Sequence, residues 1–391
     1  MYVDLTPEQH ALRRRVRDYF NGLMTPELRQ QLRGAEGGDE YRRLVRQMGR
    51  DGWLAVGWPK EYGGQGYAAT EQLIFFEEAN IAGAVLPFVT ISTVGPALMA
   101  HGSDEQKKRF LPGIAAGEII FAIGYTEPSA GSDLATLKTR AAFEAGHFVV
   151  NGNKIFTSGI EGADYVWLAA RTDPDLPRHK GISILIVDTR LPGVSHTLID
   201  TVSTRTAASY YDNVMVPADC LVGELHGGWE LITAQLNHER VTLCSSGMIE
   251  GVFQELVRWS KQNHLADGRR VIDVPWVQQN IARVYARLDF LRLMNFKVAW
   301  GAEQGHSLNP AHASSIKVFG TEFYLEACRL MLEVLGARAG LRGGSPEAAV
   351  EGRIGFLLRS IHILTFGGGT NEMQRDLIAL FGLSMPVMPR F

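Results

Sequence analysis

Hydrophobic residues recur with a helical period in the first part of the chain. Thr6-Pro7-Glu8-Gln9 has the form of a capping box with proline at the first helical position, ahead of Leu12, Val16 and Phe20. A second helix is predicted to open at Thr70-Glu71. The N-terminal part is therefore predicted to be helical.

From Ile119 to about Val222 the pattern changes to short apolar runs. The runs over 119–124, 165–169, 182–187 and 209–216 are predicted to form strands. Asn151-Gly152 lies between the β-prone segments 148–150 and 153–156, which is a strong signal for a two-residue hairpin turn. The helical period returns after Trp229 and continues almost to the end.

Helices, then strands, then helices make a segregated order rather than alternating β and α elements. No G-x-G-x-x-G motif follows the first strand, so a Rossmann sheet is disfavoured. The fold class is predicted as α+β, mainly α, with an antiparallel central sheet. We expect a helical domain over 1–118, a β domain over 119–225 and a C-terminal helical domain over 226–391, with a polar loop at 261–273.

Composition narrows the function classes. The 391 residues are 46% hydrophobic and 21% charged, with a net charge of −3, so nothing indicates a nucleic acid or an anionic membrane as partner. The three cysteines, Cys220, Cys244 and Cys328, form no C-x-x-C pair, which predicts neither a disulfide framework nor a zinc site. The N-terminal segment does not resemble a signal peptide, and no apolar run is long enough to span a bilayer. We expect a cytoplasmic protein.

The segment Tyr125–Asp133 carries the strongest chemical signal. Thr126, Gly131 and Ser132 follow a predicted buried strand, where backbone N–H groups and short hydroxyls can approach a planar, polar ligand without side-chain bulk. A Gly/Ser turn after a strand is also a common loop, so composition alone leaves both interpretations open.

The order T-E-P-x-A-G-S-D in this segment resembles the flavin-contacting signature of the acyl-CoA dehydrogenase family. Further motifs resemble that family in order and spacing, from about Leu5 to about Leu383: 58–66, 101–107, 110–112, 154–158, 216–223 and 367–372. The resemblance is strongest to the actinobacterial branch that shortens steroid side chains as mixed-subunit complexes. It implies FAD as cofactor, an acyl-CoA substrate and trans-2-enoyl-CoA as product, with electrons passed to an electron-transfer flavoprotein.

The family reaction needs a carboxylate near the alpha carbon. The position where most members carry this glutamate is Gly368 here, so the usual base is missing. Other members place the base on the first long helix after the β domain, in a segment ending Glu-Arg, and this chain has Glu239-Arg240 there. The resemblance therefore implies Glu239 as base, with Arg240 supporting it. A solvated surface pair is the alternative.

The resemblance also implies the ligand contacts. Ile123, Tyr125 and Thr126 would meet the isoalloxazine edge, and Phe156, Thr157 and Ser158 would cover its other side. Phe156 replaces the usual tryptophan and keeps an aromatic ring while losing an indole donor; as an alternative it is a hairpin core residue. Further cofactor contacts are implied at Gly131, Ser132, Thr370 and Glu372, and acyl-CoA contacts at Ser132 and Asn237.

The motifs that hold the adenine end of FAD in the neighbouring subunit of homomeric members are incomplete here. No Phe-Gly follows Arg258, and Gln is missing before Gly336-Ala337-Arg338. We therefore expect a homologous second subunit in a two-plus-two complex, unless other residues bind the adenine end. A non-catalytic partner subunit and an acyl-CoA oxidase are the competing functions.

Overall fold

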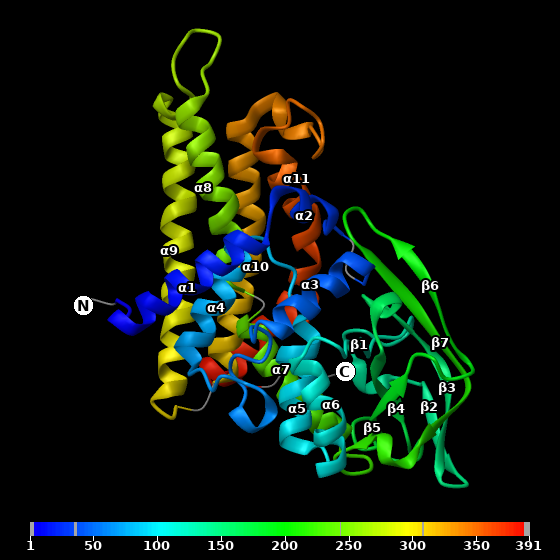
Figure 1. Ribbon diagram of the computed structural model, residues 1–391. Coiled ribbons are helices and arrows are strands. Elements are labelled where there is room, and N and C mark those ends of the chain that lie inside the picture. Colours follow the sequence, from blue (N-terminus) through cyan, green and yellow to red (C-terminus); the bar gives the residue numbers. More distant parts are fainter. Residues whose placement is uncertain (1–3, 35–36, 243, 307–308, 387–391) are drawn as a thin grey trace. The chain divides into compact units, whose positions relative to one another are not determined.

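The computed structural model describes residues 4–34, 37–242, 244–306 and 309–386, except for the side chains of 236–242. The chain forms two compact units. One comprises Met1–Gln30, Ala68–Ala84 and Arg240–Phe391, and the other comprises Gln31–Tyr67 and Val85–Glu239. The expected sequence of helices, strands and helices is present (Figure 1).

The first unit is built from long helices. Its elements are α1 (Pro7–Leu23), α2 (Pro26–Gln31, whose last residue falls in the other unit), α4 (Ala69–Ile81), α8 (Gly247–Gln262), α9 (Pro275–Glu303), α10 (Pro310–Leu335), α11 (Arg353–Ile361) and α12 (Asn371–Leu377). The loop expected at 261–273 connects α8 to α9 and contains one 3-10 turn, Val271–Asp273. No described helix is long and apolar enough to cross a membrane.

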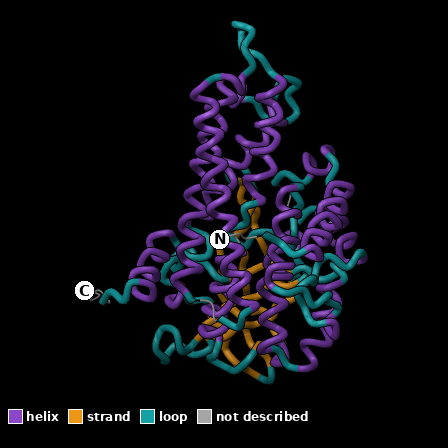
Figure 2. The backbone as a smooth tube through the Cα atoms, turned by 90° about the vertical axis from the view of Figure 1, so that its left-hand side faces the viewer, coloured by secondary structure: helices purple, strands orange, loops and turns teal. Residues whose placement is uncertain are grey.

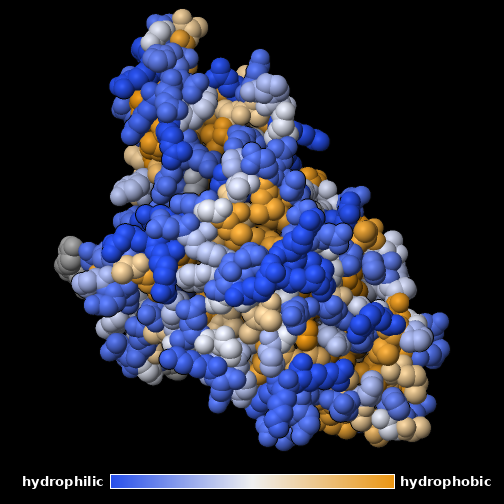
Figure 3. Space-filling view, viewed as in Figure 1, coloured by the Kyte–Doolittle hydropathy of each residue, from blue (hydrophilic) through white to orange (hydrophobic). Residues whose placement is uncertain are grey.

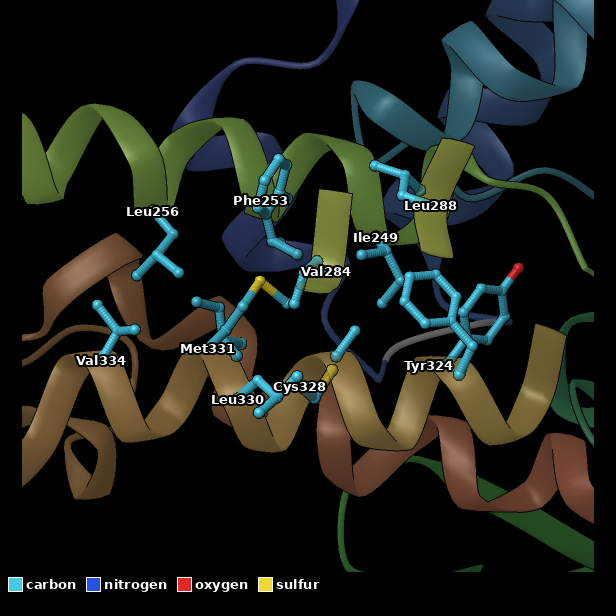
Figure 4. Packing of buried hydrophobic residues seen from close by; sticks show 14 of the residues in the cluster. Ile249, Phe253, Leu256, Val284, Leu288, Tyr324, Cys328, Leu330, Met331 and Val334 are labelled. Carbon is cyan, nitrogen blue, oxygen red and sulfur yellow. The ribbon is translucent and has the colours of Figure 1, made fainter. Parts of the chain in front are cut away.

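Apolar side chains of α8, α9 and α10 face one another in the core of this unit. Figure 4 shows Phe253 and Ile249 of α8 pointing toward α10, whose Tyr324 and Met331 point back, with Val284 of α9 beside them. All five side chains are buried. Burial of this apolar surface on three helices is the main force that holds them together.

The predicted start of α1 is confirmed. The Thr6 side chain accepts a hydrogen bond from the Gln9 backbone N–H at 3.2 Å, and the Gln9 side chain accepts one from the Thr6 N–H at 3.0 Å. This reciprocal pair satisfies two backbone donors that the first turn leaves without helical partners.

The second unit contains one mixed sheet, with strand order β6-β7-β3-β2-β4-β5-β8 and β1 paired to β4. Antiparallel pairs predominate, and β1–β4 and β2–β4 are parallel. The strands are β1 (Phe121–Gly124), β2 (Arg140–Glu144), β3 (His147–Ile155), β4 (Tyr165–Arg171), β5 (Ile182–Asp188), β6 (Val194–Asp200), β7 (Arg205–Pro217) and β8 (Leu221–Val222). The unit also holds α3 (Asp39–Arg50), α5 (Gly95–His101), α6 (Asp104–Ala115) and most of α7 (Gly228–Thr242).

Figure 2 shows the strands gathered together in one region of the molecule. Several strand side chains remain outside the core: Phe143, Leu198, Tyr210 and Met215 are each at least 40% exposed. Apolar patches among polar ones are visible over the strand region in Figure 3. The sheet is therefore buried on one side more completely than on the other.

The hairpin prediction at Asn151-Gly152 is wrong. Residues 147–155 form the single strand β3, and the turn before it lies at Ala145-Gly146, where both φ angles are positive. The Asn151 side chain instead accepts a hydrogen bond from the Asn213 N–H at 2.9 Å, where β7 has an extra residue. A Cβ at Gly152 would lie 2.6 Å from Thr139 Oγ1, so this glycine permits a close approach rather than a turn.

Candidate functional site

The signature segment forms a tight turn at the end of β1. Glu127 and Ala130 exchange backbone hydrogen bonds of 2.9 and 3.1 Å, which folds the chain back on itself. Gly131 and Ser132 follow this turn and are exposed. A Cβ built on Gly131 would have only Thr126 Cγ2 near it, at 3.8 Å. The turn therefore presents an open backbone surface beside a threonine, as the sequence predicts.

A buried ion pair between Lys154 and Glu127 holds this turn against β3. Lys154 Nζ on β3 lies 2.9 Å from Glu127 Oε1 and 3.0 Å from the Tyr125 carbonyl oxygen. Glu127 also accepts backbone hydrogen bonds from Lys138 and Thr139, at 2.7 and 2.8 Å. Lys154 is fully buried and Glu127 is 5% exposed. The pair ties the turn after β1 to the middle of the sheet.

The two charges respond differently to burial. Desolvation raises the pKa of Glu127, but the Lys154 ammonium and the hydrogen bonds outweigh it and leave the pKa below the usual value. For Lys154, desolvation dominates over the attraction of Glu127 and lowers its pKa to about 8. The pKa of Glu127 is lowered because three donors, Lys154 Nζ and the backbone N–H groups of Lys138 and Thr139, stabilise the ionised carboxylate. At neutral pH both groups are charged.

Phe156 lies next to this turn. The Ile155 N–H donates to the Thr126 carbonyl at 2.8 Å, which brings the end of β3 against the signature segment. Phe156 has a φ of 62° and its side chain is 58% exposed. It is therefore not a hairpin core residue. Its exposed ring follows Ile155, which is bonded to the half-buried Thr126, and an exposed aromatic ring near a hydroxyl fits a planar ligand with polar edges such as a flavin. The predicted flavin contacts of Ile123, Tyr125, Thr126, Gly131 and Phe156 remain predictions.

The hydroxyls after Phe156 contact the sheet. Thr157 Oγ1 is 3.0 Å from Ser209 Oγ and is fully buried, and Ser158 Oγ is 2.9 Å from Thr206 Oγ1. Both partners lie on β7, so these bonds hold the chain beyond β3 in place. The predicted cofactor contacts of Thr157 and Ser158 remain predictions.

Helix α7 is linked to the signature segment through side chains. Trp167 Nε1 on β4 donates to the Tyr125 hydroxyl oxygen at 3.1 Å, and the Tyr125 hydroxyl donates to Gln235 Oε1 on α7. Gln235 is 7% exposed. The positions of Asn237, Glu239 and Arg240 fall within α7, but their side chains lie outside the described residues.

The segment around Gly368 lies in the other unit and forms a second turn. Gly368 and Gly369 have φ angles of 69° and 94°, which favour glycine. Lys317 Nζ, fully buried on α10, donates to the Gly369 carbonyl at 2.6 Å and to Asn371 Oδ1 at 2.8 Å. Thr370 caps α12 by accepting from the Met373 N–H at 3.2 Å. Glu372 is exposed. Its carboxylate accepts hydrogen bonds from its own backbone N–H and from the Thr370 hydroxyl, and both lower its pKa.

Sequence reasoning did not identify the roles of Lys154, Trp167 and Gln235. A signal existed for Lys154, because it shares the parity of the buried residues Phe148 and Val150 along β3. No comparable signal exists for Gln235, whose partner Tyr125 is 110 residues away in the chain.

Comparison with known proteins agrees with this architecture. The models for the N-terminal, middle and C-terminal domains of acyl-CoA dehydrogenases match residues 6–118, 122–214 and 226–382. The chain is 51% identical to acyl-CoA dehydrogenase FadE26 of Mycobacterium tuberculosis, over 99% of each chain. It is 46% identical to FadE29 of the same organism, over the full length of both.

Solved structures give the same result. A chain of the ChsE4-ChsE5 complex from Mycobacterium tuberculosis is 52% identical with a TM-score of 0.93, covering 99% of this chain and 100% of that one. A chain of the Tcur3481-Tcur3483 steroid ACAD is 46% identical with a TM-score of 0.94 at the same coverage. Members of this family generally depend on FAD. The chain belongs to the acyl-CoA dehydrogenase family and is an acyl-CoA dehydrogenase.

Proposed function

We propose that this enzyme uses FAD to convert a branched or steroid-bearing acyl-CoA to the trans-2-enoyl-CoA, with Glu239 as the base. One observation carries the proposal: the signature turn, the exposed Phe156 ring and the helix on which Glu239 lies belong to one compact unit, and hydrogen bonds join all three. A ligand on this turn would therefore lie near the helix of the base.

The residues have separate tasks in this scheme. A bound FAD would supply the acceptor for the hydride that leaves the beta carbon of the substrate. Phe156 would offer a ring to stack on the isoalloxazine. Ile123 and Tyr125 would contact its edge largely through backbone groups, and Thr126 would offer a hydroxyl there. Ser132, on the exposed side of the turn, and Asn237 would contact the acyl-CoA. Glu239 removes the alpha proton, and Arg240 supports its carboxylate.

Two features favour Glu239 over the C-terminal position. The residue at 368 is glycine with a positive φ, so the turn there carries no carboxylate at that position. A non-catalytic subunit would need no acid in α7, so the glutamate at 239 argues for catalysis. An oxidase remains the competitor within enzymes, and the direct test is whether oxygen or an electron-transfer flavoprotein reoxidises the reduced enzyme faster.

Glu239→Gln tests the base directly. The amide is nearly isosteric, so the variant should remain folded and yellow while turnover falls by about 10⁴-fold or more, the upper end for general-base catalysis. Glu230→Gln, in the first turn of the same helix, is the matched control and should keep its activity. Activity above about a tenth of wild type in Glu239→Gln would reject the assignment.

The substrate class rests on the relatives. One solved relative is described as a steroid ACAD, and the shift of the base from the 368 turn to α7 would leave room near the beta carbon. Anaerobic flavin bleaching should be faster with a steroid-bearing acyl-CoA than with a straight-chain one of similar carbon number. The reverse order would reject this substrate class.

We also propose a homologous second subunit in a two-plus-two complex, in a reducing, cytoplasmic setting where the buried thiols of all three cysteines stay free. ChsE4-ChsE5 is a complex of two chains. The guanidinium of Arg338 lies over the Trp259 ring at 5.6 Å, so one candidate phosphate contact is engaged within its own chain. Native mass measurement of a fully flavinated, active homotetramer would reject the proposal.

A further inference from the structure

One cavity of the helical unit has no part in the proposed reaction. It has a volume of about 360 Å³ and is lined by residues of α1, α2 and α8 and of the end of α4. All of these residues belong to one compact unit, the one that does not contain the signature turn. The volume lies in the range of cavities that hold small organic ligands.

The helices around this cavity are fixed to one another. Arg17 on α1 donates to both carboxylate oxygens of Glu78 on α4, from Nε and Nη2 at 2.8 Å each. Helix α8 meets the end of α4 at Gly251, where a Cβ would clash with the Ile81 carbonyl oxygen. The cavity is therefore formed by packed helices before any ligand arrives, which lowers the cost of binding.

Both glutamates in the lining are already paired. Glu78 is buried, and besides Arg17 it has Arg13 Nε at 2.9 Å from its Oε1. Glu255 on α8 forms an ion pair with Arg353. Neither carboxylate therefore depends on the remaining arginines of the cavity for its compensation.

The remaining two arginines keep unused donors. Arg29 Nε is buried and has no hydrogen-bond partner among the residues that the structure describes, and its Nη1 reaches the Ala82 carbonyl only at 3.5 Å. Arg258 lines the cavity from α8 and has no ion-pair partner in the described part of the chain. A guanidinium is a planar fork of N–H donors that matches the oxygens of a phosphate group in pairs.

We propose that this cavity is a binding site for a small organic anion that carries a phosphate group. Arg29 and Arg258 donate to the phosphate oxygens, and Arg17, which is held by Glu78, adds positive charge beside them. The volume leaves room for an organic group attached to the phosphate, and Ile81 supplies apolar surface for it.

Two features oppose an anion here, and both are weak. Glu27 on α2 attracts Arg29, but it is fully exposed, so water and salt screen its charge. The carbonyl groups at the end of α4 carry a partial negative charge, which Arg29 Nη1 offsets at Ala82. Arg29 Nε and Arg258 remain available to a ligand.

Calorimetric titration of the flavin-loaded protein tests the proposal, because the bound cofactor occupies its own adenine site. The probes are inorganic phosphate, pyrophosphate and ADP, with citrate as an anion that carries carboxylates only. Arg29→Gln and Arg258→Gln each remove one guanidinium and keep an uncharged donor. Arg14→Gln, on an exposed position of α1 outside the cavity, is the matched control.

At least one phosphate compound should bind with one site per chain. Arg29→Gln and Arg258→Gln should each raise its Kd by about tenfold or more, whereas Arg14→Gln should leave it unchanged. Circular dichroism and the flavin-to-chain ratio check that each variant is folded. Because Arg258 is exposed, its substitution tests the site even if Arg29→Gln does not fold.

Three results would overturn the proposal. The first is the absence of any phosphate compound bound more tightly than about 1 mM. The second is binding that a folded Arg258→Gln variant leaves unchanged, since the anion would then lie elsewhere, for example where the acyl-CoA binds. The third is tighter binding of citrate than of all three phosphate compounds, which would mark a carboxylate site.

Discussion

A fully buried lysine anchors each of the two turns that the sequence singles out, but the lysines have different kinds of partner. Lys154 contacts the carboxylate of Glu127 directly, beneath the turn after β1. Lys317 contacts the Gly369 carbonyl and the side-chain oxygen of Asn371, and Asn371 in turn donates to Glu322 at 3.2 Å. Among the described contacts, Glu127 is buried and pairs with Lys154 directly, whereas Glu322 is partly exposed and is joined to Asn371, one partner of Lys317.

This difference predicts which turn depends more on charge. Removing one member of a buried ion pair leaves a charge without compensation, whereas a partly exposed carboxylate is replaced in part by water. The turn after β1 should therefore be sensitive to substitution of Glu127, and the turn at Gly367–Gly369 should be more sensitive to substitution of Asn371 than of Glu322.

The largest effect is expected for Glu127→Gln. Lys154 would remain buried without its carboxylate, so the free energy of unfolding should fall by about 3–5 kcal/mol at pH 7. Denaturant titration followed by tryptophan fluorescence measures this change. The double variant Glu127→Gln/Lys154→Met is the control and should recover most of the loss; no recovery would show that the pair is not the cause.

The loss of unfolding free energy in Glu127→Gln should change with pH on both the acid and the alkaline side. The pKa of Glu127 is lowered in the folded state, so its contribution is present above about 4.5 and is lost as the carboxyl takes up a proton in acid. The pKa of Lys154 is lowered from 10.5 to about 8, so the folded protein releases this proton first and gains stability between those values. In Glu127→Gln the ammonium loses the attraction of the carboxylate, so Lys154 releases its proton at a lower pH than in wild type and the variant regains stability as the pH rises. The difference between wild type and Glu127→Gln should therefore shrink both in acid and toward alkaline pH. A constant difference from pH 4 to 9.5 would contradict the model.

Asn371→Ala should have an intermediate effect. Asn371 is 4% exposed, accepts from Lys317, and donates to Thr321 Oγ1 at 3.1 Å. Loss of these bonds to buried groups should reduce the free energy of unfolding by about 1–3 kcal/mol. If the loss were as large as that of Glu127→Gln, the contrast between the two turns would not hold.

Glu322→Gln should have the smallest effect. Its carboxylate is 47% exposed and pairs with Arg375 at 2.7 Å, so its removal should change stability by less than about 1 kcal/mol. The amide can still accept from Asn371, so the turn should keep its structure. A loss above about 2 kcal/mol would mean that Lys317 depends on this acid through Asn371.

Much of this fold was predictable from local patterns. The order of helices and strands, the cap at Thr6 and four of the strands follow from periodicity and capping residues. No strand was predicted over Val194–Asp200, because β6 is mostly exposed and shows no apolar run. Asn151-Gly152 was misread because the contacts that explain both residues, with Asn213 and Thr139, come from other strands.

The candidate site also contains features that could be predicted from the sequence and features that could not. The signature turn and the aromatic at 156 could be predicted because they are continuous in sequence. The buried lysines could not be assigned to their turns, because each contact joins segments that are distant along the chain. The contacts of Trp167 and Gln235 with Tyr125 depend on three side chains meeting, and no single-residue pattern carries that information.

Phe156 combines a left-handed backbone with a largely exposed aromatic ring. For a residue with a Cβ this conformation costs roughly 1–2 kcal/mol, and an exposed ring returns little of that through burial. Glycine at 156 would therefore relieve the backbone but remove the ring that a ligand would stack on. Selection for thermal stability alone would drive this position away from phenylalanine, and the proposed flavin contact would account for its presence through a ring set in place before the ligand arrives.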